Sequence, residues 1–165
     1  MSWRTTFIFV LVATLITILV GWLTSIGILP ISQVIHYNDA GLRFIRAWIK
    51  IAIAIGIILP GIAFFVWFKY PELRKIFGFY FLVLIIQIQT EKIITSVRLQ
   101  SLVVVIGLVY SAFRVWQLKK GQQFIKSIYS QRANFKWINS VFWLLLLFWL
   151  SNLIVILTLS LPSIL

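Results

Sequence analysis

A long stretch without charge near the start of the chain limits the fold more than any other feature. From Thr5 to Asn38 there is no Lys, Arg, Asp or Glu, and residues 7–29 are strongly apolar. As a helix, these 23 residues extend about 34 Å, which is enough to cross a hydrocarbon layer about 30 Å thick. We therefore expect residues 7–29 to form a membrane span, which Pro30 ends.

Four more apolar runs follow, and together they indicate the fold class. Peptide groups inside a bilayer must be hydrogen-bonded within their own segment, which favours helices. The composition agrees, since 62% of the residues are hydrophobic and only 11% are charged. Residues 1–165 are therefore predicted to form a single integral membrane domain, an all-α polytopic transmembrane helix bundle. The five predicted spans are residues 7–29, 51–68, 73–94, 99–116 and 138–161.

The number of spans depends on residues 76–113, an apolar region that contains Glu91, Lys92 and Arg98. A single helix there would place three charges near the bilayer centre, at a cost of about 2.5–3.5 kcal/mol each. A hairpin that turns at residues 95–98 brings these charges to an interface and gives five spans. Four spans are the alternative, because the proposed turn contains no Gly, Pro or Asn.

Residues 31–50, between the first two spans, are amphipathic. The charged residues at helical spacing are Asp39, Arg43, Arg46 and Lys50. We expect this segment to form a short helix in the membrane interface, with its charged face toward the headgroups, before the chain turns into the bilayer.

Basic residues outnumber acidic ones by 15 to 3, and their positions predict the orientation. With five spans, ten Lys and Arg lie on the side of the N-terminus and five lie on the other side. Loops rich in Lys and Arg stay in the cytoplasm, so the N-terminus is predicted to be cytoplasmic and the C-terminus outside, in a plasma or inner membrane or its equivalent. Because these charges separate apolar runs and do not cover one soluble face, no nucleic-acid partner is expected.

A basic connector, residues 114–137, joins the last two predicted spans and contains no acidic residue. After Gly121, its apolar residues are spaced for a second short amphipathic helix, namely Phe124, Ile125, Ile128, Tyr129 and Phe135. Its six cations are Arg114, Lys119, Lys120, Lys126, Arg132 and Lys136. Each Lys or Arg close to a membrane attracts anionic lipid by about 1 kcal/mol, so anionic headgroups of the bilayer are predicted partners. An acidic partner protein is the alternative, and the usual bias of cytoplasmic loops also accounts for these charges.

Glu91 is the candidate ion or proton site, because an acid inside a membrane usually has a function. Gln87 precedes it by one helical turn and Arg98 follows it by two, so a continuous helix would place all three on one face. The alternative is an interfacial doublet of Glu91 and Lys92 that only ends a helix.

His36 and Asp39 are the candidate catalytic pair. A histidine near a carboxylate can act as a general base with an orienting partner. The sequence nearby offers no evident nucleophile or oxyanion donor, and Asp39 alternatively serves as the N-cap of the helix that follows it.

Small residues recur at helical spacing in the first two spans, where they allow helix backbones to approach closely. They are Gly21, Ser25, Ala52, Gly56, Pro60 and Ala63. These residues either pack spans of the same chain together or form a docking face for another membrane subunit or a second copy of the chain.

The absence of cysteine and the presence of a single histidine exclude disulfides, thiolate metal sites and iron–sulfur clusters. No metal or cofactor is expected, and the sequence has no phosphate-loop, zinc-protease or serine-hydrolase motif. The favoured function is a non-enzymatic accessory, assembly or structural component of a membrane complex. The alternatives are a small transporter or channel protomer with Glu91 as its ion site, and a membrane enzyme that acts on lipid through His36 and Asp39.

Overall fold

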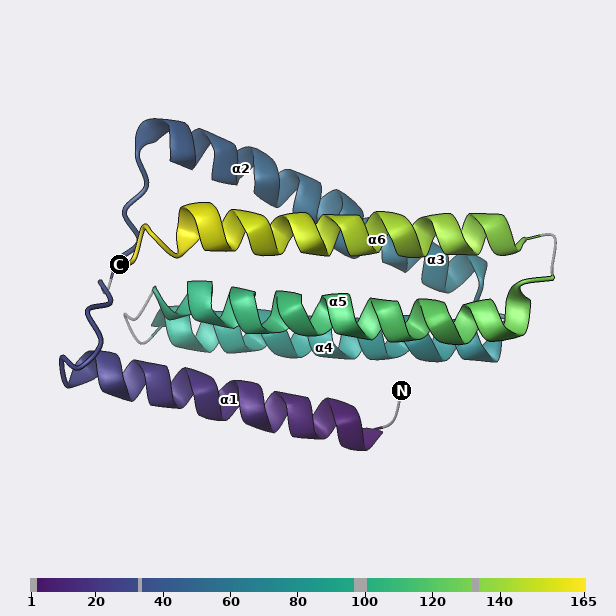
Figure 1. Cartoon of the computed structure of the whole chain (residues 1–165), viewed down its shortest axis with the longest axis horizontal. Helices are drawn as coiled ribbons and strands as arrows, with labels where there is room; N and C mark the ends of the chain where they lie inside the picture. Colours follow the sequence, from purple (N-terminus) through teal and green to yellow (C-terminus); the bar gives the residue numbers. More distant parts are fainter. Residues whose placement is uncertain (1–2, 33, 97–100, 132–133) are drawn as a thin grey trace.

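The computed structural model describes residues 3–32, 34–96, 101–131 and 134–165, which form a bundle of helices (Figure 1). Every regular element in these residues is helical. The α-helices are α1 (Trp3–Ser25), α2 (Asp39–Ile53), α3 (Leu59–Val66), α4 (Pro71–Ser96), α5 (Leu102–Tyr129) and α6 (Phe135–Val155). Two π-helical turns, η1 (Ala54–Ile58) and η2 (Ile156–Ser160), continue α2 and α6.

These elements form five rods that are long and apolar enough to span a membrane, which confirms the predicted all-α bundle. One rod consists of α2, η1 and α3, and another consists of α6 and η2. Successive rods run in opposite directions, so the two chain termini lie at opposite ends of the bundle (Figure 1). We call these the amino end, which also holds the α3–α4 junction, and the carboxyl end, which also holds the α1–α2 junction.

The prediction of a separate interfacial helix at residues 31–50 is wrong, because most of this segment belongs to the second rod. The helix that begins at Asp39 continues without a break to Val66. Asn38 caps it, since the Asn38 Oδ1 accepts a hydrogen bond from the Gly41 N–H at 2.7 Å. Asp39 is therefore the first helical residue and not the N-cap. Extending an existing helix is much easier than nucleating a new one, so the amphipathic and apolar turns form one helix.

The π-helical turn η1 ends two residues before Pro60 in the second rod. Proline has no N–H to donate, and its ring pushes away the carbonyl four residues earlier, which here belongs to Gly56. The Gly56 carbonyl instead accepts a hydrogen bond from the Tyr80 hydroxyl at 2.6 Å. A side chain of α4 thus satisfies the backbone group that the proline leaves free, as a membrane interior requires.

The fourth rod is longer than predicted, because α5 continues to Tyr129 through most of the basic connector. Gly121 lies inside this helix, where α4 and α6 approach it closely. A Cβ at Gly121 would lie 3.1 Å from the Ile76 side chain and 3.2 Å from the Phe142 ring. The glycine therefore serves close packing between helices and does not interrupt α5.

Other boundaries differ from the predictions by a few residues. α1 ends at Ser25, because the chain turns at Gly27, whose φ of +75° is a conformation that favours glycine. The predicted turn at residues 95–98 and the start of the predicted span 99–116 fall partly outside the described residues.

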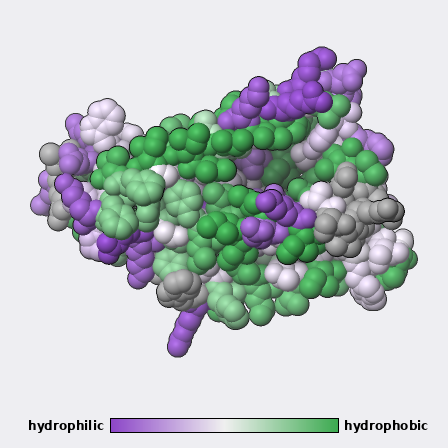
Figure 2. All heavy atoms as spheres, turned by 180° about the vertical axis from the view of Figure 1, so that it is seen from behind, coloured by the Kyte–Doolittle hydropathy of each residue, from purple (hydrophilic) through white to green (hydrophobic). Residues whose placement is uncertain are grey.

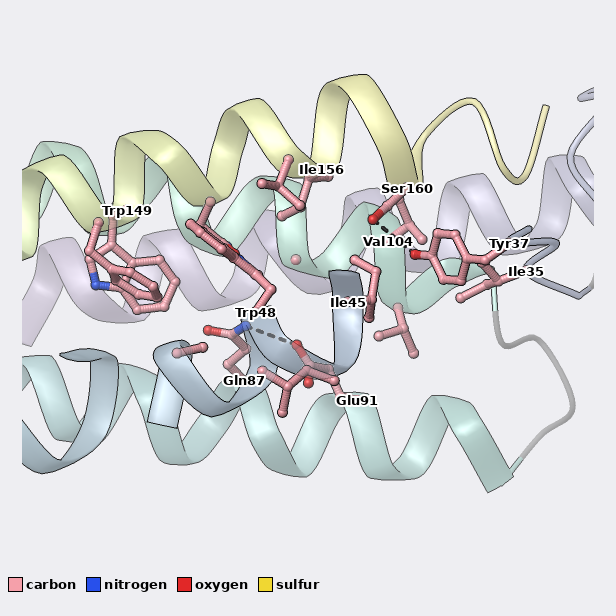
Figure 3. Close-up of a pocket in the computed structure, with 17 residues that line it drawn as sticks. Ile35, Tyr37, Ile45, Trp48, Gln87, Glu91, Val104, Trp149, Ile156 and Ser160 are labelled. Carbon is pink, nitrogen blue, oxygen red and sulfur yellow. Dashed lines mark hydrogen bonds between the residues drawn. The ribbon is translucent and has the colours of Figure 1, made fainter. Parts of the chain in front are cut away.

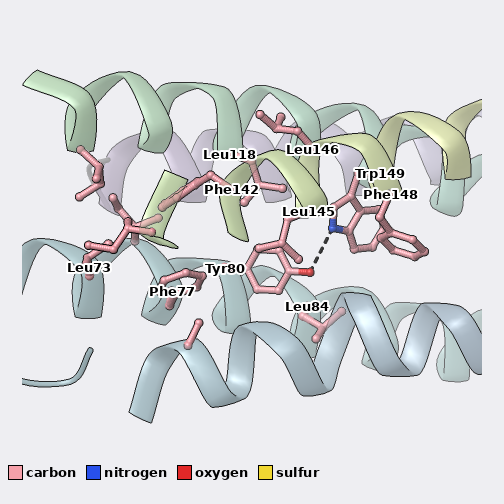
Figure 4. Close-up of a cluster of buried hydrophobic side chains, with 14 of the residues drawn as sticks. Leu73, Phe77, Tyr80, Leu84, Leu118, Phe142, Leu145, Leu146, Phe148 and Trp149 are labelled. Carbon is pink, nitrogen blue, oxygen red and sulfur yellow. Dashed lines mark hydrogen bonds between the residues drawn. The ribbon is translucent and has the colours of Figure 1, made fainter. Parts of the chain in front are cut away.

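Aromatic and aliphatic side chains fill the amino half of the bundle, where α3, α4, α5 and α6 meet (Figure 4). Phe77 and Phe142 are fully buried at its centre, with their ring centroids 5.7 Å apart. The buried members of this amino-half cluster are Ala63, Leu73, Ile76, Phe77, Tyr80, Leu84, Leu118, Ile125, Tyr129, Ile138, Phe142, Leu145, Leu146, Phe148 and Trp149. A smaller cluster joins α1 to α4 and α5, where the Phe9 ring stacks on Phe113 at 3.6 Å.

The outer faces of the rods are apolar. On the face shown in Figure 2, hydrophobic residues cover most of the middle, hydrophilic residues lie toward both ends, and one further hydrophilic group lies among the hydrophobic residues. Large apolar side chains such as Phe7, Phe65 and Leu147 are exposed on these faces. Lipid tails solvate such a surface better than water does, so the outer faces agree with five rods that are long and apolar enough to span a membrane.

Candidate functional site

The rod that begins with α2 diverges from α6 toward the carboxyl end (Figure 1), and a cavity of about 440 Å³ lies there between α2, α4, α5 and α6. Most of its walls are aliphatic or aromatic. Its polar lining residues are Tyr37, Gln87, Glu91, Asn152 and Ser160 (Figure 3). Small-molecule sites in proteins usually occupy roughly 300–1,000 Å³, so the cavity is large enough to bind one.

Glu91 also lines two further hollows beside this cavity. The first, of about 520 Å³, lies at the carboxyl end and is lined by Ile35, Ile88, Glu91, Lys92, Thr95 and Val103. The second, of about 190 Å³, separates the second rod from α4, and its aliphatic lining is Ile49, Ala52, Ile53, Ile57, Leu84 and Ile88. Among the described residues, Glu91 alone belongs to the linings of all three.

Glu91 is partly buried and bonded to a neighbour on its own helix. The Gln87 Nε2 donates a hydrogen bond to the Glu91 Oε1 at 2.8 Å (Figure 3). The Gln87 Oε1 is buried and has no hydrogen-bond partner among the described residues. Glu91 follows Lys75, at the amino end, by 16 residues, or about 24 Å along the helix axis. A hydrocarbon layer about 30 Å thick that begins at Lys75 would therefore include this carboxylate near its carboxyl-end boundary.

A second polar group ties three rods together at the cavity wall. The Trp48 indole N–H donates to the Asn152 Oδ1 at 2.8 Å, and the Asn152 Nδ2 donates to the Ser111 Oγ at 2.8 Å. The Asn152 amide therefore uses both of its ends to connect α2, α5 and α6. This arrangement is structural, because it leaves little of the amide available to a ligand.

Arg114 lies in the bundle interior, next to the inner wall of the cavity. Its side chain is fully buried, and its Nη1 donates to the Tyr80 carbonyl at 2.6 Å. The guanidinium lies 4.1 Å from the Tyr80 ring and 5.3 Å from the Trp149 ring. The Trp149 indole N–H in turn donates to the Tyr80 hydroxyl at 3.1 Å (Figure 4).

The position of Arg114 departs from the prediction that grouped it with the surface cations of the connector. Because α5 continues as one helix, Arg114 shares the inward face of Leu118, Gly121 and Ile125, all of which are buried. Two of its nitrogens, Nε and Nη2, have no hydrogen-bond partner among the described residues. A desolvated cation is costly, and the two aromatic rings offset part of that cost, on the order of 2 kcal/mol.

A loop before α2 covers the carboxyl end of the cavity. The backbone N–H groups of Ser32 and His36 donate to the carbonyls of Ile164 and Ser163, at 2.7 and 3.1 Å. The Tyr37 hydroxyl donates to the Ser160 Oγ at 2.9 Å (Figure 3). Among the described residues, these three hydrogen bonds and the packing of Ile31 and Ile35 in the cluster around Ile164 fasten the cover of the cavity to the C-terminal segment.

The predicted catalytic pair lies outside the cavity. The side chains of His36 and Asp39 are exposed, and neither residue lines any of the three hollows. Their position gives no support to a catalytic site built on them.

The predicted packing residues mostly lie between rods of this chain. A Cβ at Gly56 would lie 3.2 Å from the Phe148 ring, and Pro60 and Ala63 are buried. Ala52 lines the cavity, Gly21 is buried, and Ser25 is exposed. The second-rod residues thus serve packing within the chain.

Four of the predicted surface cations are exposed near the amino end, namely Lys119, Lys120, Lys126 and Lys136. Arg132 lies outside the described residues.

Sequence reasoning missed the group formed by Tyr80, Trp149 and the Gly56 carbonyl. These three positions belong to different rods, so no local spacing connects them. The sequence did contain one signal that Arg114 is buried, because apolar or small residues follow it at helical intervals.

Comparison of the chain with models of protein families, with characterised proteins and with solved structures found no match. The function of the cavity therefore has to be argued from its own residues and their geometry.

Proposed function

We propose that this membrane protein is a small carrier that binds a cation at Glu91. The observation that carries the proposal is the meeting of three hollows at one carboxylate on α4, a rod long and apolar enough to span a membrane. Ionisable side chains within membrane-spanning segments are costly, and they usually mark substrate or ion pathways. The surroundings of Glu91 thus support the transporter alternative over the favoured expectation of an accessory component.

One-sided access favours a carrier over a channel. The hollows lie at the carboxyl end and beside the lipid, whereas the interior toward the amino end holds Arg114 and the amino-half cluster. A cation moving from Glu91 toward the amino end would approach a buried positive charge in surroundings of low dielectric constant. Transfer across the bundle therefore requires the helices to rearrange, as in alternating access.

The test is cation-driven current across liposomes that contain the purified protein, recorded after concentration jumps of protons, Na⁺, K⁺ and small organic ammonium ions. We expect at least one of these cations to produce a current, and Glu91→Gln to reduce it more than tenfold. Asp39→Asn is the matched control, because it removes an exposed carboxylate at the same end of the bundle. Equal currents from Glu91→Gln and the natural chain, or no current with any cation, would refute the carrier.

The proposed orientation places the N-terminus in the cytoplasm and the C-terminus outside, in a plasma or inner membrane or its equivalent. The excess of Lys and Arg at the amino end supports it. Because the chain has no cysteine, single cysteines can report the side directly. In intact cells, a membrane-impermeant maleimide should label Leu165→Cys and leave Gln131→Cys unlabelled; the reverse result would invert the orientation.

A second candidate function, an accessory or assembly component, is supported by the exposed lysines near the amino end. They suit anionic headgroups or an acidic partner subunit. Gentle detergent extraction followed by native gels tests this candidate. A hetero-complex that is lost when Lys119, Lys120, Lys126 and Lys136 are changed to Gln supports it, whereas a homo-oligomer or a monomer counts against it.

A further inference from the structure

The chemistry around Glu91 selects the kind of cation. A metal ion such as Ca²⁺ requires about 6–8 oxygen ligands. The described residues contain no group of three or more His, Cys, Asp or Glu that could hold a metal ion. Beside Glu91 and Gln87, the wall toward α2 consists of apolar side chains such as Ile49 and Ala52. A cation bound there must therefore satisfy most of its surface with apolar contacts.

Aromatic rings contribute a large part of the remaining lining, namely Tyr37, Trp48, Phe148 and Trp149. Both indole N–H groups already donate within the protein, from Trp48 to Asn152 and from Trp149 to Tyr80. The two tryptophans therefore offer apolar ring surface to a ligand and no free hydrogen-bond donor. Ring surface beside a carboxylate suits an organic ammonium ligand, because the carboxylate pairs with its charge and the rings contact its apolar body.

Three charges, those of Glu91, Lys92 and Arg114, fix the direction in which such a ligand binds. Lys92 lines the carboxyl-end hollow beside Glu91 and repels a cation from that hollow. Glu91 attracts an ammonium head at the α4 side of the cavity. Arg114 lies 5.3 Å from the Trp149 ring, which lines the same cavity, and repels a cation from that side. The head is therefore held at Glu91 and Gln87, and the apolar body extends toward Trp149.

The hollow between the second rod and α4 gives such a ligand a route from the lipid. Ile53 and Ile57 line this hollow and are also exposed on the outer face of the bundle. Amphipathic cations gather at the membrane interface with their apolar part in the acyl region. A molecule in that position reaches Glu91 without exposing its apolar body to water.

We infer that the ligand of Glu91 is an organic monocation with an apolar body, of the alkylammonium class, and that it arrives from the bilayer between α2 and α4. The inference rests on the proposed function, since it names the class of cation that the carrier binds.

Binding is measured by titration calorimetry on the purified protein in nanodiscs of a zwitterionic lipid, with empty nanodiscs as the blank. The probes are octylammonium, octanol and octanoate, which share the chain and differ in charge. We expect octylammonium to bind at least tenfold more tightly than octanol, and octanoate not to bind. Glu91→Gln should abolish the preference for the cation, and its thermal unfolding shows whether the variant is folded.

A second variant tests the route and leaves the carboxylate in place. Ile53→Trp fills the hollow between α2 and α4, so it should slow the association of octylammonium severalfold. Ile62→Trp is the matched control, because it adds the same ring to an exposed position on the same rod away from the hollow. Equal association rates for both variants would overturn the lateral route.

The outcomes separate the ligand class from the carrier itself. Equal binding of octylammonium and octanol, or unchanged binding in a folded Glu91→Gln protein, would overturn the alkylammonium class. If Na⁺, K⁺ or protons give currents that depend on Glu91 while octylammonium does not bind, the ligand class fails and the carrier stands. If there is neither current nor binding, both proposals fail.

Discussion

The two halves of the bundle differ in how their helices fill space. In the amino half, aromatic rings and glycines interlock between α3, α4, α5 and α6, and Phe77 and Phe142 are fully buried. In the carboxyl half, the second rod diverges and leaves a cavity beside Glu91. Without a hydrophobic driving force inside lipid, the fit between side chains decides where helices adhere. The amino half is therefore the more tightly packed part of the bundle, and the carboxyl half contains the cavity at which we propose that a ligand binds.

The two halves should differ most in how much unfolding free energy is lost when a buried side chain is shortened. Phe142→Ala leaves a cavity in the amino-half cluster and should lower the free energy of unfolding by about 3–5 kcal/mol. Ile49→Ala, at the cavity wall, should cost less than about 1 kcal/mol because that side chain already lies in a loosely filled region. Unfolding in mixed micelles with increasing denaturing detergent measures both, and similar losses would mean that the halves are equally packed.

Two glycines of α5, Gly107 and Gly121, provide a sharper comparison of packing, because a Cβ added at each would lie at different distances from neighbouring side chains. At Gly121 the nearest atoms are 3.1 and 3.2 Å away on Ile76 and Phe142, so Gly121→Ala should destabilise by about 1–3 kcal/mol. At Gly107 the nearest atom, on Ile156, is 3.4 Å away, so Gly107→Ala should be neutral or stabilising by up to about 1 kcal/mol. The same detergent titration measures the change in unfolding free energy for both variants. A loss of stability at both positions would contradict the difference in packing between Gly121 and Gly107.

Loss of the hydrogen bonds at the cavity wall should lower the free energy of unfolding less than loss of a packed ring does. Asn152→Leu removes the acceptor of the Trp48 indole and the donor to Ser111, which should cost about 0.6–2 kcal/mol. Ser151→Leu is the control, because Ser151 is exposed on the outer face beside it. If Asn152→Leu unfolds at the same detergent concentration as the control, the Asn152 amide does not hold the three rods together.

The smallest loss of unfolding free energy is expected in the loop before α2 that covers the cavity. Tyr37→Phe removes the hydrogen bond to Ser160 and should cost up to about 1 kcal/mol. Ser160→Ala should cost a similar amount, and the double variant no more than either single change, because both remove the same bond. Hydrogen exchange of the Ser32 and His36 amides should become faster in each variant, and unchanged exchange would show that Tyr37 does not fasten the loop.

Much of the fold follows from the linear pattern of apolar and charged residues, and less of the site does. The five rods were predictable because each apolar run is long enough to cross a bilayer, and Glu91 was recognisable as an acid within a largely apolar region. The continuity of residues 39–66 was not predicted, because an amphipathic segment resembles an interfacial helix until its neighbours are known. The cavity was not predictable either, since its lining comes from residues far apart in the chain.

The sequence by itself determined that the apolar runs form helical rods and roughly where each rod lies, because every peptide group in lipid must be bonded within its own helix. It left open whether there are four or five rods, and the second and fourth rods are longer than the sequence predicted. The tertiary structure alone decided which polar side chains lie inside, as Arg114 and Lys119 show: five residues apart on α5, one is fully buried and the other is exposed. The physical reason is that the rotation of a helix about its axis is fixed only when its neighbours pack against it. The same packing places Glu91 beside a cavity that no single segment encodes.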